Sequence, residues 1–149
     1  MDYSDVKVTV RPIEEADLEA VLSLSGRNIS KDDIISSDPS ETASLCFVAE
    51  ADGIVVGFNL AHRLHVGIPL NKICVIQGIV VHDSYRRLGI GEKLVEAVFE
   101  QCSDCGISLV RALVEDSDLR LQRFIEHLGF ERSTVINYDR AIYCRIPTR

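Results

Sequence analysis

The segment ICVIQGIVVHDSYRRLGIGEKLVEAVF, residues 73–99, joins an apolar run to a basic, glycine-containing turn and then to a helical pattern. The run from Ile73 to Val81 is rich in β-branched residues, which is typical of a strand covered on both faces. Polar turn chemistry ends the run at residues 82–84. From Ile90 onward, apolar residues recur at spacings of three and four, so the sequence predicts a helix packed on that strand.

The turn between the predicted strand and helix is Arg86-Arg87-Leu88-Gly89-Ile90-Gly91. Its glycines allow unusual backbone dihedral angles and the close approach of a ligand. The free N–H groups in the first turn of the helix carry partial positive charge, so the turn forms an anion cradle suited to phosphate. Tight packing of the glycines is the structural alternative, because such short motifs often match by chance. A Rossmann fingerprint is excluded by Leu94, and a Walker loop by the absence of Gly-Lys-Ser/Thr.

Length and charge limit the class of protein. At 149 residues the chain is expected to form one domain, residues 1–149. Its formal net charge of −7 argues against a nucleic-acid partner. The sequence contains neither a membrane-spanning apolar window nor the apolar core of a signal peptide, so we expect a cytoplasmic protein with no membrane partner.

The cysteines predict no disulfide framework. There are five, an odd number, and most lie in apolar strand patterns typical of reduced core thiols. The spacing Cys102-x-x-Cys105 raises the alternative of a metal or redox site. A zinc site would need two more ligands at a similar spacing, and none follows, so we expect no metal.

The rest of the chain predicts further elements around this segment. Alternation predicts strands at residues 6–10, 45–50 and 54–61, with a hairpin at Asp52-Gly53 joining the last two. Helical spacing and stop signals predict helices that end at Gly26 and Gly129. The remaining predictions are a loop over residues 27–44, a loop with Gly67 and Pro69, a buried strand over 107–114 and one or two closing strands within 134–146.

The motif Arg86-x-x-Gly89-x-Gly91 resembles the acyl-CoA signature of the GCN5-related N-acetyltransferase (GNAT) family. The opening VTVRPIEEADLEAV and the later DLRLQRFIEHLGF resemble the first strand and helix and the late helix of that family. The resemblance covers nearly the whole chain, in the expected order. It implies an α/β (α+β) GNAT fold with a mixed, mostly antiparallel central sheet of six to seven strands, whose fourth and fifth strands splay apart, and about four helices.

The resemblance also implies a cofactor site. Acetyl-CoA would be the co-substrate, with backbone groups of the splayed strand holding its pantetheine arm and the N–H of Ile79 near the thioester oxygen. The turn would hold the pyrophosphate, helped by one of the two arginines. The implied cofactor-binding residues are Ile79, Val80, Val81, Arg86, Arg87, Leu88, Gly89, Ile90, Gly91, Glu92, Asp118 and Phe124.

The implied reaction is direct acetyl transfer from acetyl-CoA to a primary amine, on a small molecule or on a protein N-terminus or lysine. Two departures from the family pattern affect the mechanism. Ile125 stands where the family often has a proton-donating tyrosine, and the central strand offers only Gln77 where many relatives have a carboxylate. His82 and Tyr143, with Tyr138, are the candidate catalytic residues; the alternatives are a loop histidine and tyrosines that only pack.

These departures leave a second function open, a non-catalytic acyl-CoA-binding sensor or partner subunit. The presumed acceptor walls, residues 27–44 and 61–72, carry no motif that would name the amine. Exposed late strands would give a homodimer by edge pairing.

Overall fold

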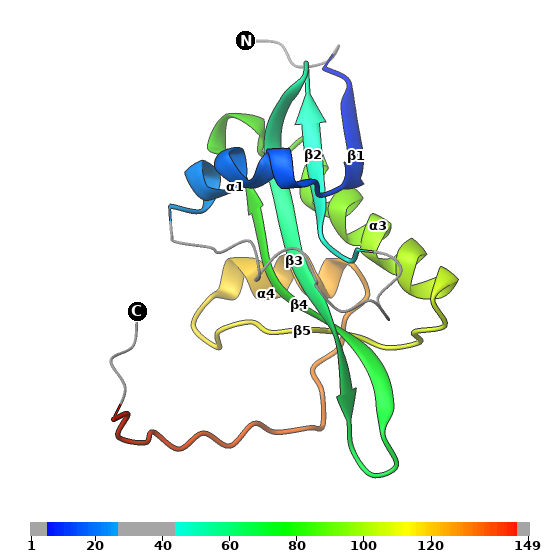
Figure 1. The fold of residues 1–149 in the computed structure, drawn as a ribbon, viewed down its shortest axis with the longest axis vertical. Coiled ribbons are helices and arrows are strands. Elements are labelled where there is room, and N and C mark those ends of the chain that lie inside the picture. The colour runs from blue at the N-terminus through cyan, green and yellow to red at the C-terminus, as the bar shows by residue number, and fades with distance from the viewer. Residues whose placement is uncertain (1–5, 27–43, 146–149) are drawn as a thin grey trace. The chain divides into compact units, whose positions relative to one another are not determined.

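The computed structural model describes residues 6–26 and 44–145 and has two units, Met1–Glu115 and Asp116–Arg149. The first unit contains a five-stranded sheet in the order β1-β2-β3-β4-β5 (Figure 1). The first four strands pair antiparallel, and β5 pairs parallel to β4. The strands are β1 (Val8–Pro12), β2 (Phe47–Ala51), β3 (Ile54–Val66), β4 (Asn71–Val81) and β5 (Val110–Ala112).

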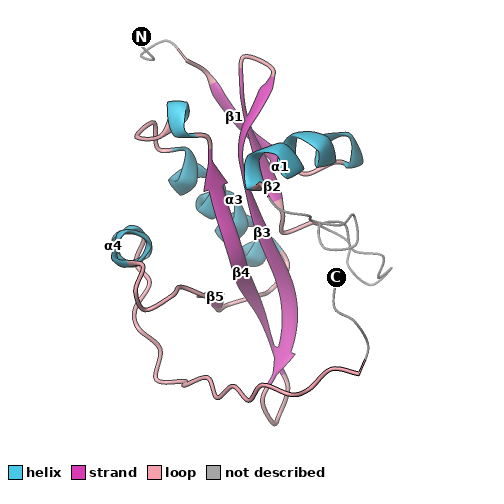
Figure 2. Ribbon diagram, turned by 90° about the vertical axis from the view of Figure 1, so that its left-hand side faces the viewer, coloured by secondary structure: helices cyan, strands magenta, loops and turns pink. Residues whose placement is uncertain are grey.

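Helices cover both faces of this sheet (Figures 1 and 2). Helix α1 (Leu18–Ser25) follows the short 3-10 helix η1 (Glu15–Asp17), lies on one face and ends at Gly26, whose φ of 63° is left-handed. Helix α3 (Ile90–Asp104) follows η2 (Asp83–Tyr85) and lies on the other face. The apolar core therefore has two layers, one on each side of the strands.

The two layers have different side chains. On the α1 side, Val21, Val48 and Phe58 pack with the half-buried Val80 of β4. On the α3 side the helix buries Ile90, Leu94, Val95, Val98 and Cys102, at the spacings of three and four that the sequence predicted.

The predicted hairpin between β2 and β3 is confirmed. Asp52 and Gly53 both have left-handed backbones, with φ of 52° and 77°, as a two-residue hairpin turn requires. Strand β3 is longer than predicted and continues to Val66, so the turn to β4 contains only residues 67–70.

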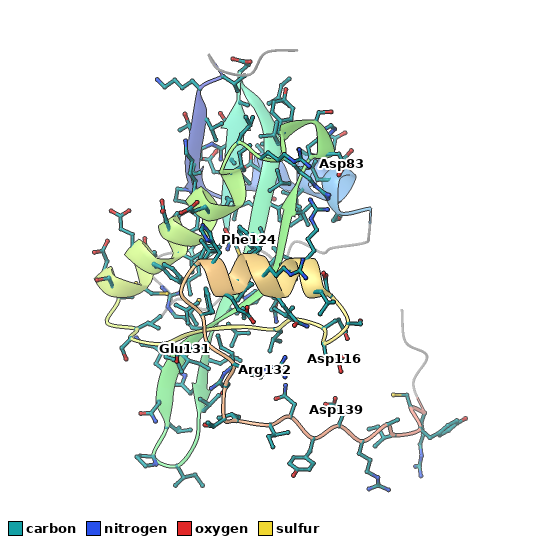
Figure 3. The ribbon with its side chains drawn as sticks, turned by 180° about the vertical axis from the view of Figure 1, so that it is seen from behind. Asp83, Asp116, Phe124, Glu131, Arg132 and Asp139 are labelled. Carbon is teal, nitrogen blue, oxygen red and sulfur yellow. The ribbon has the colours of Figure 1, made fainter. Side chains whose placement is uncertain are left out.

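The second unit is a helix followed by an extended segment (Figure 3). Helix α4 (Leu119–His127) begins after Asp118, whose carboxylate accepts a hydrogen bond from the N–H of Leu121 at 3.1 Å. Residues 131–145 are exposed and form neither helix nor strand.

Three predictions about the sheet need correction. The described residues form five strands and three α-helices, where six to seven strands and about four helices were expected. The closing strands predicted within 134–146 are wrong as far as residue 145, because alternation confers β-propensity but a strand also needs a hydrogen-bonded neighbour. The strand predicted over 107–114 is reduced to β5. The predicted loop over 27–44 lies, except for Ser44, outside the described residues.

Candidate functional site: the open side of β4 and the turn before α3

A β-bulge at Gln77 divides β4 into two parts. On β3, the consecutive residues Leu60 and Ala61 pair with Gly78 and Ile76, so Gln77 is the extra residue. Before the bulge, the side chains from Ile73 to Ile76 are buried, whereas Gln77 is exposed and the residues after it are half-buried. The prediction that the whole run is covered on both faces is therefore correct only for its first half.

Strand β5 accompanies only the first part of β4. Their paired residues run from Cys74 with Val110 to Ile76 with Ala112. The N–H of Leu113 donates to the carbonyl of Ile76 at 3.3 Å, and the described strands include no partner for β4 beyond it on that side. From Gln77 to Val81, no described strand pairs with this side of β4, which we call its open side. The family resemblance predicts that the fourth and fifth strands splay apart at this place.

The bulge determines which backbone groups face the open side. The N–H of His82 donates to the carbonyl of Val56 on β3 at 2.8 Å, and donors toward one neighbour alternate along an antiparallel strand. Val80 therefore directs its N–H and C=O toward β3, while Ile79 and Val81 direct theirs to the open side. These are the two residues expected to supply backbone contacts.

The turn before α3 presents a second set of free donors. Gly89 is the N-cap residue with φ of 73°, and Arg87 is also left-handed with φ of 69°, which is uncommon outside glycine. Within the described part of the chain, no hydrogen bond is formed by the amides from Arg87 to Glu92, whereas the next amide, of Lys93, donates to the carbonyl of Gly89 at 3.0 Å. The run of unpaired N–H groups, with the helix dipole behind it, suits an anion.

Gly57 of β3 fixes the turn against the strand. A Cβ atom at this position would lie 3.1 Å from the carbonyl oxygen of Val80, 3.2 Å from a methyl of Ile90 and 3.5 Å from a methyl of Val81. The start of α3 can thus rest on the end of β4 only if residue 57 has no side chain. Gly57 was not among the predicted site residues, although a glycine inside a strand pattern is itself a signal of close approach.

The two arginines of the turn have different surroundings. The guanidinium of Arg86 lies 3.0 Å from the carboxylate of Asp83, three residues earlier, in an exposed ion pair. Arg87 is exposed, and the described residues include no ion pair to it. Of the two, Arg87 is the arginine whose charge is available to an anion. Figure 3 marks Asp83 at this turn.

His82 has a structural role that the sequence did not predict. Its Nδ1 accepts a hydrogen bond from the N–H of Ser84 at 3.1 Å, which caps η2. Its ring also makes an edge contact with Tyr85, with 5.8 Å between the ring centroids. A neutral imidazole has one lone pair that can accept a hydrogen bond, and here that lone pair accepts the N–H of Ser84. A proton on Nδ1 would therefore break the hydrogen bond that caps η2.

The other predicted site residues belong to the second unit. Asp118 caps α4, and Tyr138 and Tyr143 lie in the extended segment after that helix. Phe124, which is labelled in Figure 3, and the buried Ile125 lie on the helix itself. Both tyrosines are 91% exposed, so the packing role considered for them does not occur within the described residues. The structure therefore brings together the predicted residues from Ile79 to Glu92.

The residues that the structure describes contain no cluster of His, Cys, Asp or Glu that could hold a metal ion. They also include no helix long and apolar enough to cross a membrane. The donors of the site are main-chain amides and one free guanidinium, which fit a ligand with a peptide-like arm and a diphosphate.

Comparison with known proteins gives a matching family model and a similar characterised protein. The model of the acetyltransferase (GNAT) family matches residues 12–130. Aminoglycoside N(6')-acetyltransferase type 1 of Salmonella typhimurium strain LT2 is 26% identical over 102 residues, which is 66% of this chain and 67% of that protein.

Solved structures share the fold. Aminoglycoside N-acetyltransferase AAC(6')-Iy in complex with CoA has a TM-score of 0.75 and 25% identity, covering 90% of this chain and 100% of that one. Naa50 of Arabidopsis thaliana, in complex with the bisubstrate analogue CoA-Ac-MVNAL, has a TM-score of 0.67 and 18% identity, covering 85% and 84%. With the family model matching from Pro12 to Phe130 and the open strand and amide-rich turn inside that range, the chain belongs to the acetyltransferase (GNAT) family.

Proposed function

We propose that this chain transfers the acetyl group of acetyl-CoA to a primary amine. The observation that carries the proposal is the close succession of two sets of free backbone donors. One set is Ile79 and Val81 on the open side of β4. The other is the run of amides from Arg87 to Glu92. The first suits the amide groups of a pantetheine arm, and the second suits a diphosphate.

In this proposal each part of the site has one task. Bound acetyl-CoA would supply the acyl group and a thiol leaving group. The open side of β4 would hold the arm by main-chain hydrogen bonds, and the N–H of Ile79 would supply a donor that stabilises negative charge on the thioester oxygen. The turn binds the diphosphate, with Arg87 adding a charge-assisted contact.

The amine must lose a proton before it attacks, because an amine with a pKa of about 10.4 is almost fully protonated at neutral pH. β4 carries no carboxylate for this purpose, and the Nδ1 lone pair of His82 is engaged by Ser84. We therefore assign the first proton acceptor to solvent water. Ile125 cannot protonate the leaving thiolate, so departure of the thiolate relies on the acidity of the CoA thiol itself.

For the acceptor, we propose a small molecule with several amino groups, of which an aminoglycoside is the first to test. The support is the similarity to an aminoglycoside N(6')-acetyltransferase together with the net charge of −7, which would attract a polycation. A peptide N-terminus is the second candidate, on the weaker ground that a structural neighbour was solved with CoA-Ac-MVNAL.

The test is the release of free thiol from acetyl-CoA in the presence of an aminoglycoside, a linear polyamine or a short peptide. We expect turnover with at least one multi-amine acceptor, and mass spectrometry should find one added acetyl group per product. If none of these amines is acetylated although CoA binds tightly, the non-catalytic CoA-binding alternative replaces the enzyme.

A second measurement tests the turn itself. Replacing Arg87 with alanine should weaken CoA binding by about tenfold, whereas Arg86→Ala should have a smaller effect because Arg86 is paired with Asp83. Neither change should affect turnover of acetyl-pantetheine, which lacks the diphosphate. Equal losses with acetyl-CoA and acetyl-pantetheine would contradict a diphosphate site at this turn.

A further inference from the structure

Cys105 lies at the far end of α3 from the proposed cofactor site. The helix begins at Ile90, next to the turn, and Cys105 is its C-cap residue. With a rise of about 1.5 Å per residue, the two ends are about 22 Å apart. The Cys105 thiol is partly exposed, so small molecules can reach it without entering the core.

Two N–H donors converge on the sulfur of Cys105. Nε2 of Gln101, one helical turn earlier, donates to Sγ at 3.2 Å. Nη2 of Arg63, on β3, donates to the same sulfur at 3.3 Å. A guanidinium stays charged at any physiological pH and can only donate, so this pair of contacts favours a sulfur that carries negative charge.

The charges around Cys105 act in opposite directions. The hydrogen bonds from Gln101 and then Arg63 lower the pKa of the Cys105 thiol, and the positive charges of Arg63 and Lys72 lower it further. Partial burial raises it. The carbonyls at the C-terminal end of α3 also disfavour a thiolate, but a hydrogen bond from a charged donor is the stronger effect at a partly exposed helix end.

The other cysteines lack this environment. Burial raises the pKa of the Cys74 thiol on β4 and of the Cys102 thiol on α3, which lie near each other. The buried Cys46 thiol donates to the carbonyl of Ala61 at 3.4 Å. Cys144 is exposed in the extended C-terminal segment. Among these five thiols, Cys105 alone combines access with two converging N–H donors.

We propose that Cys105 is a modification site, the thiol of this protein that a peroxide oxidises first. The sulfur of Cys105, as thiolate, attacks one oxygen of hydrogen peroxide. An S–O bond forms, the O–O bond breaks and hydroxide leaves. The product is a sulfenic acid: the sulfur is oxidised by two electrons and the peroxide is reduced. This inference does not depend on the acetyl-transfer proposal, because it uses no residue of that site.

Labelling of the whole protein tests the proposal, with Cys144 as an internal standard in the same molecule. At pH 7 under native conditions, we expect iodoacetamide to alkylate Cys105 about tenfold faster than Cys144, because the two N–H donors at the Cys105 sulfur stabilise its thiolate. After treatment with hydrogen peroxide and dimedone, the adduct should be found on the Cys105 peptide. Equal labelling of the two cysteines, or a dimedone adduct mainly on Cys144, would overturn the proposal.

Two variants separate the hydrogen-bond network from simple exposure. Arg63→Met and Gln101→Met each remove one donor and keep most of the side-chain volume, so each should reduce the ratio of Cys105 to Cys144 labelling severalfold. Lys93→Met, which removes a charge from the exposed face of α3, should leave the ratio unchanged. Should Arg63→Met fail to fold by circular dichroism, Gln101→Met decides alone. An unchanged ratio in the folded variants would show that the donors do not activate the thiol.

Discussion

At the scale of single residues, Asp17 is the one charged side chain that is buried among the described residues of the first unit. Its side chain is 7% exposed and accepts two hydrogen bonds from the guanidinium of Arg11, at 2.7 and 2.8 Å. It also accepts the N–H of Glu14 at 2.8 Å, and Arg11 in turn donates to Glu50 of β2. These contacts tie β1, η1 and β2 together where the first helix leaves the sheet.

The pKa of Asp17 predicts how this cluster responds to acid. The hydrogen bonds from Arg11, and then that from Glu14, hold its pKa below the usual value, against the opposing effect of burial. A carboxylate with a lowered folded pKa stabilises the protein above its unfolded pKa, and this contribution disappears as the pH falls through the folded pKa. We expect Asp17→Asn to reduce the free energy of unfolding by about 2–3 kcal/mol at pH 7.

Urea titrations at several pH values check this. The difference between wild type and Asp17→Asn should begin to shrink below about pH 4, where the Asp17 carboxyl of the unfolded state takes up its proton, and should shrink further until the pH has fallen through the lowered pKa of the folded state. The exposed Glu96, changed to Gln, is the matched control and should differ little from wild type at any pH. A gap that stays constant down to pH 2 would mean that ionisation of Asp17 contributes nothing.

His82 makes a second prediction at this scale, because capping and base catalysis respond differently to two substitutions. Asparagine can accept the N–H of Ser84 but cannot act as a base, whereas alanine can do neither. If His82 only holds the turn, His82→Asn should keep near wild-type kcat, and His82→Ala should mainly raise the KM for acetyl-CoA by severalfold. A comparable collapse of kcat in both variants would identify His82 as a catalytic base.

At the scale of elements, the meeting of β3, β4 and α3 at Gly57 predicts a local limit on side-chain size. Gly57→Ala should destabilise the protein by about 1–3 kcal/mol, since the new methyl would press on the Val80 carbonyl and on Ile90. Gly78, which lies inside the neighbouring strand β4, is the matched control: a Cβ there would meet nothing within 4 Å. Gly78→Ala should therefore be neutral or slightly stabilising. Thermal unfolding followed by circular dichroism separates the two outcomes.

Elements with local signals were predictable from the sequence. The Asp52-Gly53 hairpin, the stop of α1 at Gly26 and the buried stripe of α3 each follow from a few neighbouring residues, and each is confirmed. Strand pairing is not local. The Thr134–Ile146 segment has the alternation of a strand, but whether it forms one depends on a partner distant in the sequence, and its described residues form none.

The candidate site likewise combines a part that local sequence predicts with parts that depend on distant residues. The turn from Arg86 to Gly91 could be predicted from its own residues, and the structure confirms that it leads into a helix. The choice between Arg86 and Arg87 needed the ion pair with Asp83. The open side of β4 needed the register of β5, which pairs over only Cys74–Ile76, and no pattern within β4 announces where that pairing stops. The cofactor-binding roles implied for the residues from Ile79 to Glu92, for Asp118 and for Phe124, and the catalytic roles considered for His82 and Tyr143, all stay predictions.

At the scale of the whole molecule, the net charge of −7 bears on the acceptor. If the substrate is a polycation, its encounter with the protein is accelerated by the protein's field, and added salt screens that field. We expect kcat/KM for an aminoglycoside to fall about tenfold between low and high ionic strength. A monoamine of similar size is the control and should lose much less. Equal salt dependence for both would remove charge as a reason for choosing a polyamine.

The extra residue at Gln77 changes which face of the sheet each later side chain of β4 occupies. Cys74 and Val81 are an odd number of residues apart, yet Cys74 lies beside Cys102 of α3 and Val81 packs near Ile90 of the same helix. An insertion in β3 between Leu60 and Ala61 would give Gln77 a partner. Each side chain of β4 after Gln77 would then lie on the opposite face of the sheet. Gly78 and Val80 would then offer their amides to solvent in place of Ile79 and Val81. The length of β3 thus decides which amides of β4 face the open side, although β3 contributes none of those amides itself.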